Sequence, residues 1–572
     1  MSTNLPSSTS TSALIIGGGP TGLTTSLLLA AHGIPSVIVE RHASRTAQPK
    51  AHAINPRSLE IFRQLGLDTT ALRAEGVPPE DGDTVRFTVS MSGRELGRLP
   101  YERQDQETLG ITPEPLFNIP QPRLERWLLE AVRGSGLVRY FDGVQWEACD
   151  YSSSSTSSTS SSTGEDNSEE AQGLLLTSTV LNRATNETHT IKSKYILDCG
   201  GANSRARAKL DIPFSPLPEY VQNEVHHVSV HIRGDLSAFP PSTLLWAVSP
   251  QVEGTFICYG RKTDWVFVKY YNPATTPKET FTEEVCRGLI DKAIGKPVPY
   301  EIQSILVWST WPRTAEVYES PRFPGRAFVA GDAAHAFPPT GGLGVNTGIA
   351  DAHNLVWKIA AVEKGWTTRL LASYHTERRP IAVANARQSV KNQVKLVQLR
   401  AALQNPPDID AGAEYVKWKQ RLDAALENNR EHFDSINLQI GYVYTSEGGG
   451  EGEGETGQTA RPCDCYVPSG VPGARLPHTW VSRLQGGEKG EGRASVLDLV
   501  EGTAFTLLKS SVPIRILRQG VDFEVTDASW LETVGLSGTG QGLLVRPDQH
   551  ILGNVRDAAG VQALLEGLLS SR

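Results

Sequence analysis

The most informative segment of the chain reads Ala13-Leu14-Ile15-Ile16-Gly17-Gly18-Gly19-Pro20-Thr21-Gly22. Its apolar run predicts a buried strand, and the glycines after it have the spacing G-x-G-x-x-G at the start of a helix. In that arrangement Gly17 permits a tight turn, Gly19 lets the backbone approach a pyrophosphate, and Gly22 lets the helix pack close to the strand. The helix N-terminus then offers free N–H groups to a phosphate. The segment therefore predicts a dinucleotide-binding turn; a glycine-rich turn without a ligand is the alternative.

The chain continues from this turn into a second strand. Residues 22–32 show a helical pattern of apolar side chains, and Ser36-Val37-Ile38-Val39-Glu40 follows as another buried run. Strand, helix and strand make one βαβ unit, which predicts a parallel sheet and an α/β fold class. Glu40 lies 18 residues after Gly22, where an acidic side chain accepts hydrogen bonds from the ribose of an adenosine.

Length and composition exclude several classes of protein. The 572 residues carry a formal net charge of −8 and no Lys/Arg-rich block, which argues against nucleic acid as a partner. Six cysteines are too few for a disulfide scaffold, and no apolar run reaches the roughly 18–20 residues of a membrane span. The polar N-terminus has no basic start, so we expect no secretory signal and a cytoplasmic location. No carboxylate or cysteine lies at metal-ligand spacing around His226 and His227, and no metal site is expected.

Shifts in composition divide the chain into domains. The Ser/Thr-rich residues 152–172 cannot bury enough apolar area to fold, and residues 447–457 have the Gly/Glu-rich composition of a flexible linker. Alternating residues at 225–230 and 265–270 predict antiparallel strands. Strands of a small C-terminal α/β unit are predicted at 496–499, 505–508, 514–517 and 542–545. The expected organisation is a disordered N-terminus at 1–12, a dinucleotide domain at 13–210 and 321–445 with an insert at 152–172, a β-sheet domain at 211–320, a linker at 446–460 and a C-terminal domain at 461–572.

A second segment contributes to the dinucleotide site. Residues 325–346 read GRAFVAGDAAHAFPPTGGLGVN. Residues 327–330 predict a buried strand, Asp332 follows a glycine that lets it face a ligand, and the turn at 341–346 precedes a helix with further free N–H groups. Two separated backbone turns and two acidic side chains fit a flavin dinucleotide. One turn would hold its pyrophosphate, and the other its ribityl chain and ring.

At this point the chain resembles a known family. Gly-Asp-Ala-Ala-His followed by Pro-Pro and Gly-Gly-Leu-Gly-x-Asn, at 331–346, resembles the second FAD signature of the single-component FAD-dependent aromatic hydroxylases, the para-hydroxybenzoate hydroxylase superfamily. Residues 351–358 and 374–380 extend the similarity, while 472–478 and 544–548 resemble the C-terminal domain of the phenol 2-monooxygenase and dichlorophenol monooxygenase branch. The resemblance implies a Rossmann-like FAD-binding domain, an inserted antiparallel β-sheet substrate domain and a thioredoxin-like C-terminal domain. Because this last domain lacks Cys-x-x-Cys, we expect it to pack on the main body or to support a homodimer.

The resemblance also implies which residues contact FAD. Asp332 is expected on the ribityl side, Val345 under the ring, Gln121 against the flavin and Arg41 near the adenosine. For Gln121 and Arg41, a polar surface position without a ligand is the alternative. The expected FAD-binding residues are Gly17, Gly19, Gly22, Glu40, Arg41, Gln121, Asp332, Gly342, Gly344, Val345 and Asn346.

One family motif differs in this chain. Alignment of residues 201–204 places Gly200 where the family has an aspartate, and Asp198 lies two residues earlier on the same side of a strand. The difference implies weaker or altered use of the nicotinamide. No second strand-linked G-x-G-x-x-G occurs, so we expect NAD(P)H to bind transiently in a groove rather than in a domain of its own.

His52 is the candidate catalytic base. It lies five residues before Arg57 in the loop after Glu40, a position that resembles the base site of phenol-type hydroxylases. Its ordinary pKa of about 6.5 suits a base near neutral pH. Asn118 could orient its imidazole; the alternative is that His52 only packs or contacts FAD. His335 is interpreted as a structural hydrogen-bonding residue.

The resemblance implies a FAD-dependent monooxygenase. Such an enzyme uses NAD(P)H and O2 to hydroxylate a small phenolic or polycyclic aromatic substrate through a flavin hydroperoxide. A base that withdraws the phenol proton makes the ring a better target. Epoxidation or Baeyer–Villiger oxidation of a polyketide-like substrate is an alternative within flavin chemistry, and a non-catalytic flavin-fold protein is an alternative of a different class.

Overall fold

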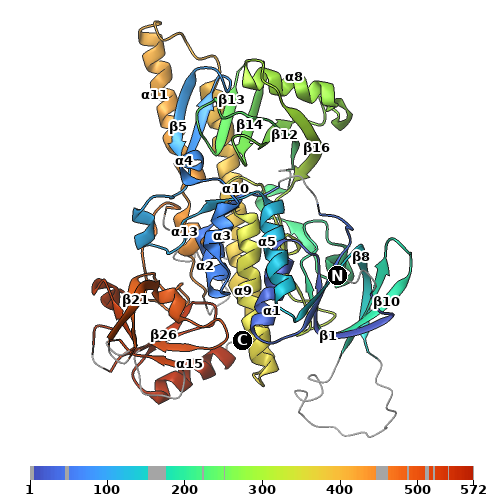
Figure 1. Ribbon diagram of the computed structural model, residues 1–572, viewed down its shortest axis with the longest axis vertical. Coiled ribbons are helices and arrows are strands. Elements are labelled where there is room, and N and C mark those ends of the chain that lie inside the picture. Colours follow the sequence, from blue (N-terminus) through green and yellow to red (C-terminus); the bar gives the residue numbers. More distant parts are fainter. Residues whose placement is uncertain are drawn as a thin grey trace.

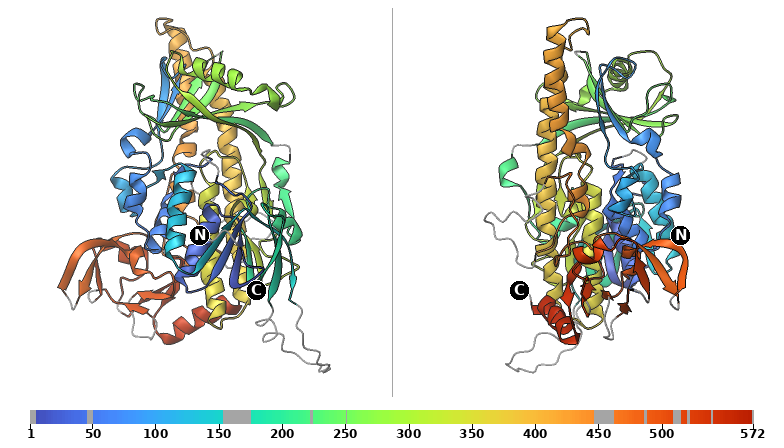
Figure 2. Two further views of the ribbon diagram at one scale, coloured as in Figure 1. Left: turned by 45° about the vertical axis from the view of Figure 1, so that its right-hand side comes forward. Right: turned by 90° about the vertical axis from the view of Figure 1, so that its left-hand side faces the viewer.

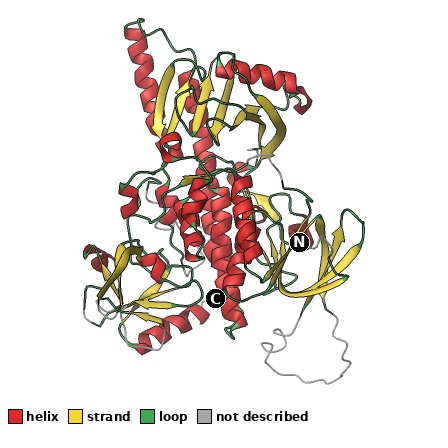
Figure 3. Cartoon of the chain, in the orientation of Figure 1, coloured by secondary structure: helices red, strands yellow, loops and turns green. Residues whose placement is uncertain are grey.

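Three units make up the molecule. The computed structural model describes residues 5–45, 50–152, 175–221, 224–249, 251–445, 462–485, 488–508, 515–519, 522–538 and 540–570. The insert predicted at 152–172, except its first residue, and the linker predicted at 446–460 lie outside these residues. Figures 1 and 2 show a central α/β body, with a β-sheet domain and a C-terminal unit at opposite ends of its long helices. These helices, which Figure 3 shows at the centre, are α9 (Gly344–Glu363) and α10 (Arg369–Leu403).

A seven-stranded sheet forms the core of the α/β body. Its strand β1 (Ser8–Ile16) runs parallel to both neighbours, β2 (Ser36–Glu40) and β10 (Thr188–Asp198). From the second segment, β18 (Ala327–Val329) adds in parallel to β10. Because the first glycine turn follows β1 and Asp332 follows β18, and both strands run parallel in one sheet, the turn and Asp332 lie at the same edge of it. The remaining strands are β7 (Val138–Asp142), β8 (Val144–Tyr151) and β9 (Leu176–Asn182).

The N-terminal disorder predicted for residues 1–12 is wrong for residues 8–12. Strand β1 begins at Ser8, which pairs with Thr190 of β10. Strand pairing uses backbone groups, so a run of serine and threonine can extend a strand whenever a neighbouring strand is available. Thr9 is buried in that extension. The partner strand comes from far along the chain, and no local pattern indicates it.

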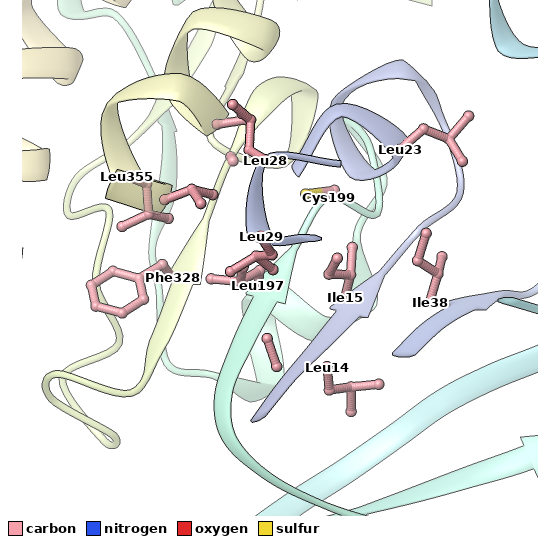
Figure 4. Close-up of a cluster of buried hydrophobic side chains, with 14 of the residues drawn as sticks. Leu14, Ile15, Leu23, Leu28, Leu29, Ile38, Leu197, Cys199, Phe328 and Leu355 are labelled. Carbon is pink, nitrogen blue, oxygen red and sulfur yellow. The ribbon is translucent and has the colours of Figure 1, made fainter. Parts of the chain in front are cut away.

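Apolar side chains from the two sequence segments form one core. Figure 4 shows Ile15, Leu28 and Leu197 from the first part of the chain in the same cluster as Phe328 and Leu355 from the second. All five are buried, and each contributes roughly 1.5–3 kcal/mol of transfer free energy. Helix α1 (Pro20–Ala31) packs against α9 in this core. The core therefore holds the two glycine turns in fixed relative positions.

A second seven-stranded sheet forms the β-sheet domain. The predicted antiparallel strands are present, but β4 (Thr84–Thr88) and β5 (Glu95–Pro100) from the first part of the chain complete the sheet. The domain is therefore not confined to residues 211–320. Helix α8 (Glu283–Ile294) covers the outer face, where Val228 and Val230 are buried, and alternate residues lie on the inner face. The other strands are β12 (Val225–Arg233), β13 (Leu244–Val248), β14 (Glu253–Cys258), β15 (Asp264–Tyr271) and β16 (Glu301–Thr310).

The C-terminal unit contains two small sheets and the helix α15 (Ala558–Ser570). The strand predicted at 496–499 is wrong, because these residues form a 3-10 helix, η5 (Val496–Leu499). A capping box of Ser495 and Asp498 starts this helix and satisfies its first N–H groups. No helix in the described part of the chain is long and apolar enough to cross a membrane. The strands are β20 (Trp480–Gln485), β21 (Glu488–Ser495), β22 (Thr506–Leu508), β23 (Arg515–Leu517), β24 (Phe523–Val525), β25 (Gly542–Val545) and β26 (Ile551–Val555).

Candidate functional site

The first glycine turn is held by close contacts between backbone atoms. A Cβ on Gly17, whose φ is +102°, would lie 2.4 Å from the carbonyl oxygen of Cys199. A Cβ on Gly22 would lie 2.1 Å from the carbonyl oxygen of Gly17. A Cβ on Gly19 would meet nothing within 4 Å. Gly17 and Gly22 are therefore required by the protein itself, while the backbone at Gly19 faces open space.

Helix α1 begins at this turn with free N–H groups. Its N-cap is Gly19, no side chain caps it, and its first turn has no acidic residue. Glu40 accepts hydrogen bonds from the N–H groups of Gly18 and His42, each at 2.9 Å. Arg41 is half-buried and bonds to His42 rather than to the turn. This arrangement leaves the helix N-terminus available to a phosphate.

Arg45 is a candidate that the sequence analysis missed. Its guanidinium donates to the carbonyl oxygen of Gly18 at 2.8 Å, to Glu125 at 2.7 Å and to the hydroxyl of Tyr140 at 3.1 Å. A cation therefore lies against the first glycine turn. No spacing rule identifies it, because its partners come from other elements of the fold.

The second segment places Asp332 just after β18, in the short 3-10 helix η4 (Gly331–Ala333). Protein atoms surround the carboxyl group, and burial raises its pKa, opposed by His335 and Lys50. The side chain is nevertheless exposed to solvent, so it lines an open space rather than a packed core. Helix α9 begins nearby, at Gly344, without a side-chain cap or an acidic residue in its first turn. This gives a second helix N-terminus without a side-chain cap, and Asp332 lies beside it: a Cβ on Gly344 would be 3.9 Å from an oxygen of that carboxyl group.

Asn346 connects the second turn to a distant segment. Its Oδ1 accepts hydrogen bonds from the N–H of Asn55 at 3.0 Å and the hydroxyl of Ser58 at 2.7 Å. Its Nδ2 donates to the carbonyl oxygens of Ala53 at 2.9 Å and Gly342 at 2.8 Å. All four side-chain bonds go to the protein, so the amide fixes the turn and leaves ligand contacts to the backbone.

His52 lies on the segment that Asn346 holds. Its Nδ1 is 3.0 Å from Oδ1 of Asn118, as the predicted orienting role requires. The imidazole stacks on Tyr101 with ring centroids 6.2 Å apart and meets Tyr259 edge-on at 5.9 Å. The sequence analysis missed both tyrosines, because β5 and β14 approach His52 only in the folded chain. The hydroxyl of Tyr259 is buried without a hydrogen-bond partner in the described structure.

Burial lowers the pKa of His52, and the hydrogen bond to Asn118 only partly opposes this. The imidazole is therefore neutral near pH 7. With Nδ1–H donating to Asn118, Nε2 keeps its lone pair and can accept a proton. The side chain remains partly exposed to solvent, as Asp332 does, so a small molecule could reach it.

Gln121 pairs with the residue before His52. It begins helix α5 (Gln121–Gly134), and its N–H donates to the carbonyl oxygen of Ala51 at 2.9 Å. Its side-chain oxygen accepts from the N–H of Ala51 at 3.3 Å, and its Nε2 donates to Glu125 at 2.8 Å. Gln121 therefore holds the His52 segment in place; direct contact between Gln121 and a cofactor stays a prediction.

Comparison with known proteins decides the family. The family model described as "FAD binding domain" matches residues 10–389. The chain belongs to this FAD-binding family. One relative, phenol 2-monooxygenase of Pseudomonas sp., is 29% identical to this chain. The aligned region spans 95% of this chain and 89% of the relative. The 2,4-dichlorophenol 6-monooxygenase of Cupriavidus pinatubonensis is 27% identical, with coverage of 95% and 92%.

Solved structures agree with this assignment. The flavin-dependent monooxygenase PieE, in complex with FAD and substrate, has a TM-score of 0.82 and 26% identity over 98% of this chain and 99% of its own. Aklavinone-11 hydroxylase, in a ternary complex with FAD and aklavinone, has a TM-score of 0.74 and 26% identity over 98% of each chain. The chain is a FAD-dependent enzyme of the aromatic monooxygenase family, and the predicted resemblance is confirmed.

The residues present fit FAD, the cofactor of this FAD-binding enzyme. Neither helix N-terminus has a side-chain cap or an acidic residue in its first turn, open space adjoins Gly19, and the exposed Asp332 lies beside the start of α9. Backbone N–H groups of the first turn would hold the pyrophosphate, and those at the start of α9 the flavin side. The individual contacts remain predictions.

The predictions for Asp198 and His335 concern hydrogen bonds within the protein. Asp198 is buried and accepts from the N–H of Gly200 at 2.9 Å and the hydroxyl of Ser204 at 2.6 Å, so it stabilises its own loop. As predicted, His335 makes a structural hydrogen bond, to Asp351 at 2.7 Å. Burial alone would raise the pKa of Asp351, but His335 and Arg378 hold it below its ordinary value.

Proposed function

We propose that this enzyme hydroxylates a phenolic ring and that His52 takes the proton from the phenol oxygen. The observation that carries the proposal is the neutral imidazole of His52, oriented by Asn118 on the segment that Asn346 bonds to the second turn. Bound FAD, reduced by NAD(P)H, supplies activated oxygen. A phenol has a pKa of about 10, so removal of its proton by Nε2 makes the ring more electron-rich and easier to hydroxylate.

The inner face of the β-sheet domain supports an aromatic substrate. Val268 and Tyr270 of β15 lie on the same face as Trp308 of β16, opposite the face that α8 covers. All three are partly exposed, and the part of Tyr270 and Trp308 that Arg400 and His227 leave open offers aromatic surface to a ring. Two relatives are named for phenol and dichlorophenol, and a third is a tetracenomycin A2 monooxygenase-dioxygenase. We infer a phenolic substrate with one ring or several fused rings.

The test measures NAD(P)H consumption and the fate of oxygen. The purified holoenzyme is given NADH or NADPH, 18O2, and a panel of mono- and polycyclic phenols with matched ketones. We expect one phenol or more to stimulate NAD(P)H oxidation and to gain one 18O atom by mass spectrometry. A product with 18O inserted beside a ketone carbonyl would replace the proposal with Baeyer–Villiger oxidation. No stimulated oxidation by any phenol would reject it.

A further inference from the structure

Helix α2 (Pro56–Gln64) links the C-terminal unit to the flavin site. It begins four residues beyond His52, and its first turn bonds to Asn346. Its buried polar side chains bond to the C-terminal unit. We propose that the C-terminal unit is a positioning element for the flavin-facing segment 52–58, acting through Gln549, and that it acts without contacting FAD.

A buried ion cluster joins α2 to the start of the C-terminal unit. Glu60 accepts from the guanidinium of Arg475 through both carboxylate oxygens, one at 2.8 Å, and from Arg57 at 3.1 Å. All three residues are at most 2% exposed. Burial alone would raise the pKa of Glu60, but Arg475 and Arg57 lower it to about 2. A charged group that is buried this deeply requires its partners, so α2 cannot move away from Arg475 without a large penalty.

Arg57 makes the second link, at the other end of the C-terminal sequence. Its guanidinium donates to Oε1 of Gln549 at 2.7 Å and to the carbonyl oxygen of Asp548 at 2.7 Å. Nε2 of Gln549 donates in turn to the carbonyl oxygen of Leu497. Gln549 is 1% exposed and has a φ of +60°, a strained value for this residue type. Such strain is kept where the surrounding contacts determine the conformation.

The same part of the C-terminal unit is anchored to the long helices. Arg546 donates to both oxygens of Glu377 on α10 at 2.8 and 2.9 Å, and to Asp548 at 2.6 Å. Lys358 of α9 donates to Glu377 at 2.9 Å. The residues that hold Arg57 are therefore fixed to α10 and to α9, the helix that begins in the second turn.

These contacts form a continuous path from Gln549 to the flavin-facing backbone. Gln549 bonds to Arg57, the next residue Ser58 bonds to Asn346, and Asn346 bonds to Gly342 and to the segment that carries His52. A displacement of about 1 Å in a positioned group costs up to roughly 100-fold in rate. A small shift of α2 would therefore change the affinity for FAD and the contacts around His52.

Three full-length variants test the proposal in the FAD-loaded protein. Gln549→Met removes both the acceptor for Arg57 and the donor to Leu497, Gln549→Glu removes only the donor, and Ile551→Val trims the buried core of the C-terminal unit. We expect Gln549→Met to weaken FAD binding about 5-fold or more and to shift the flavin absorption spectrum and midpoint potential. Gln549→Glu should remain within about twofold of wild type, and Ile551→Val should change only the melting temperature.

The outcomes separate positioning from stability. Wild-type FAD affinity, spectrum and potential in folded Gln549→Met would overturn the proposal, as would equal changes in Ile551→Val. If Gln549→Met does not fold, Gln549→Asn replaces it, because asparagine tolerates the positive φ but is too short to reach Arg57. The pH profile of phenol hydroxylation can be measured on the same variants, and it is the one measurement that depends on the proposed role of His52. The flavin measurements therefore remain decisive even if no phenol is hydroxylated.

Discussion

The two glycine turns of the FAD site are held in place by different kinds of contact. In the first turn, backbone atoms touch backbone atoms, and a Cβ on Gly22 would approach the Gly17 oxygen to 2.1 Å. In the second turn, the side chain of Asn346 bonds to Gly342 and to the segment after His52. The first turn is held by backbone contacts, within its own segment at Gly22 and with the distant Cys199 at Gly17. The second depends on a partner almost three hundred residues away, and that partner carries the proposed chemistry.

Substitution of Gly22 by alanine is the strongest test of the first turn. The added methyl group would force the α1 backbone away from Gly17. We expect FAD affinity to fall about 100-fold or more, equivalent to roughly 3 kcal/mol, so that the purified protein is nearly colourless. The measurement is the ratio of flavin to protein absorbance, followed by FAD titration of the apoprotein.

Gly19→Ala is the matched control in the same turn. Its Cβ meets no protein atom within 4 Å, so its melting temperature should equal that of the wild type. If the Gly19 backbone faces the pyrophosphate, this variant should still lose FAD affinity. Full flavin occupancy in both variants would show that the first turn does not bind the cofactor.

The second turn differs from the first because Asn346 bonds it to the segment that carries His52, the candidate catalytic base. We expect His52→Ala to keep the flavin and to lower phenol hydroxylation about 100-fold, because it removes the general base. Asn118→Ala should lower the rate less, since the base remains but loses its orientation. Steady-state turnover and the flavin spectrum are measured together. A colourless His52→Ala protein would instead mean that His52 serves the flavin.

The pH dependence of the same reaction sharpens this assignment. Burial lowers the pKa of His52 below its ordinary value of 6.5, so the neutral, proton-accepting form persists to lower pH. Hydroxylation should rise with pH through an apparent pKa below about 6.5 and then be flat through pH 7–8. That acidic limb should be missing in His52→Ala. An unchanged limb in the variant would assign the titration to another group.

Asn346→Ala tests whether side-chain hydrogen bonds hold the second turn. Loss of the amide leaves several buried groups unpaired, at about 1–3 kcal/mol each before relaxation. We expect FAD affinity to fall about 10-fold and the protein to melt earlier, as followed by titration and calorimetry. Asn385→Ala is the control, because this buried asparagine donates one hydrogen bond, to Thr347, and does not contact residues 53–58. Equal losses in both variants would contradict a specific role for Asn346.

The contrast between the turns also explains what the sequence could predict. The strand, turn and helix around Gly17 were predictable because their pattern lies within one segment, although the contact that requires glycine at position 17 is with the distant Cys199. Three contacts were not predicted. They are the pairing of β4 and β5 with the β-sheet domain, the hydrogen bonds of Asn346 to the segment after His52, and the packing of Tyr101 and Tyr259 on His52. These contacts join segments far apart in the chain, so no spacing rule reports them.

Misread local patterns account for the remaining errors. Residues 8–12 lacked the apolar side chains that mark a strand, although β10 supplied the backbone partners they needed. The apolar run at 496–499 has the composition of a strand, but the capping box of Ser495 and Asp498 favours a helical turn. In the first case backbone pairing forms a strand where no apolar pattern marks one, and in the second case capping overrides an apolar pattern.

Gly342→Ala places in the second turn the same substitution as Gly22→Ala in the first, and we expect the smallest effect of the series. Gly342 has a φ of +63°, and its added Cβ would lie 3.0 Å from the Cβ of Ala53, a tight contact but a longer one than the 2.1 Å approach at Gly22. Left-handed strain of about 1 kcal/mol should weaken FAD binding roughly 5-fold. Gly365→Ala, with φ +95° and no atom near its Cβ, carries similar strain at the far end of α9 and should leave FAD affinity unchanged. If Gly342→Ala proved as damaging as Gly22→Ala, the second turn would also depend on close backbone packing, and the contrast between the two turns would disappear.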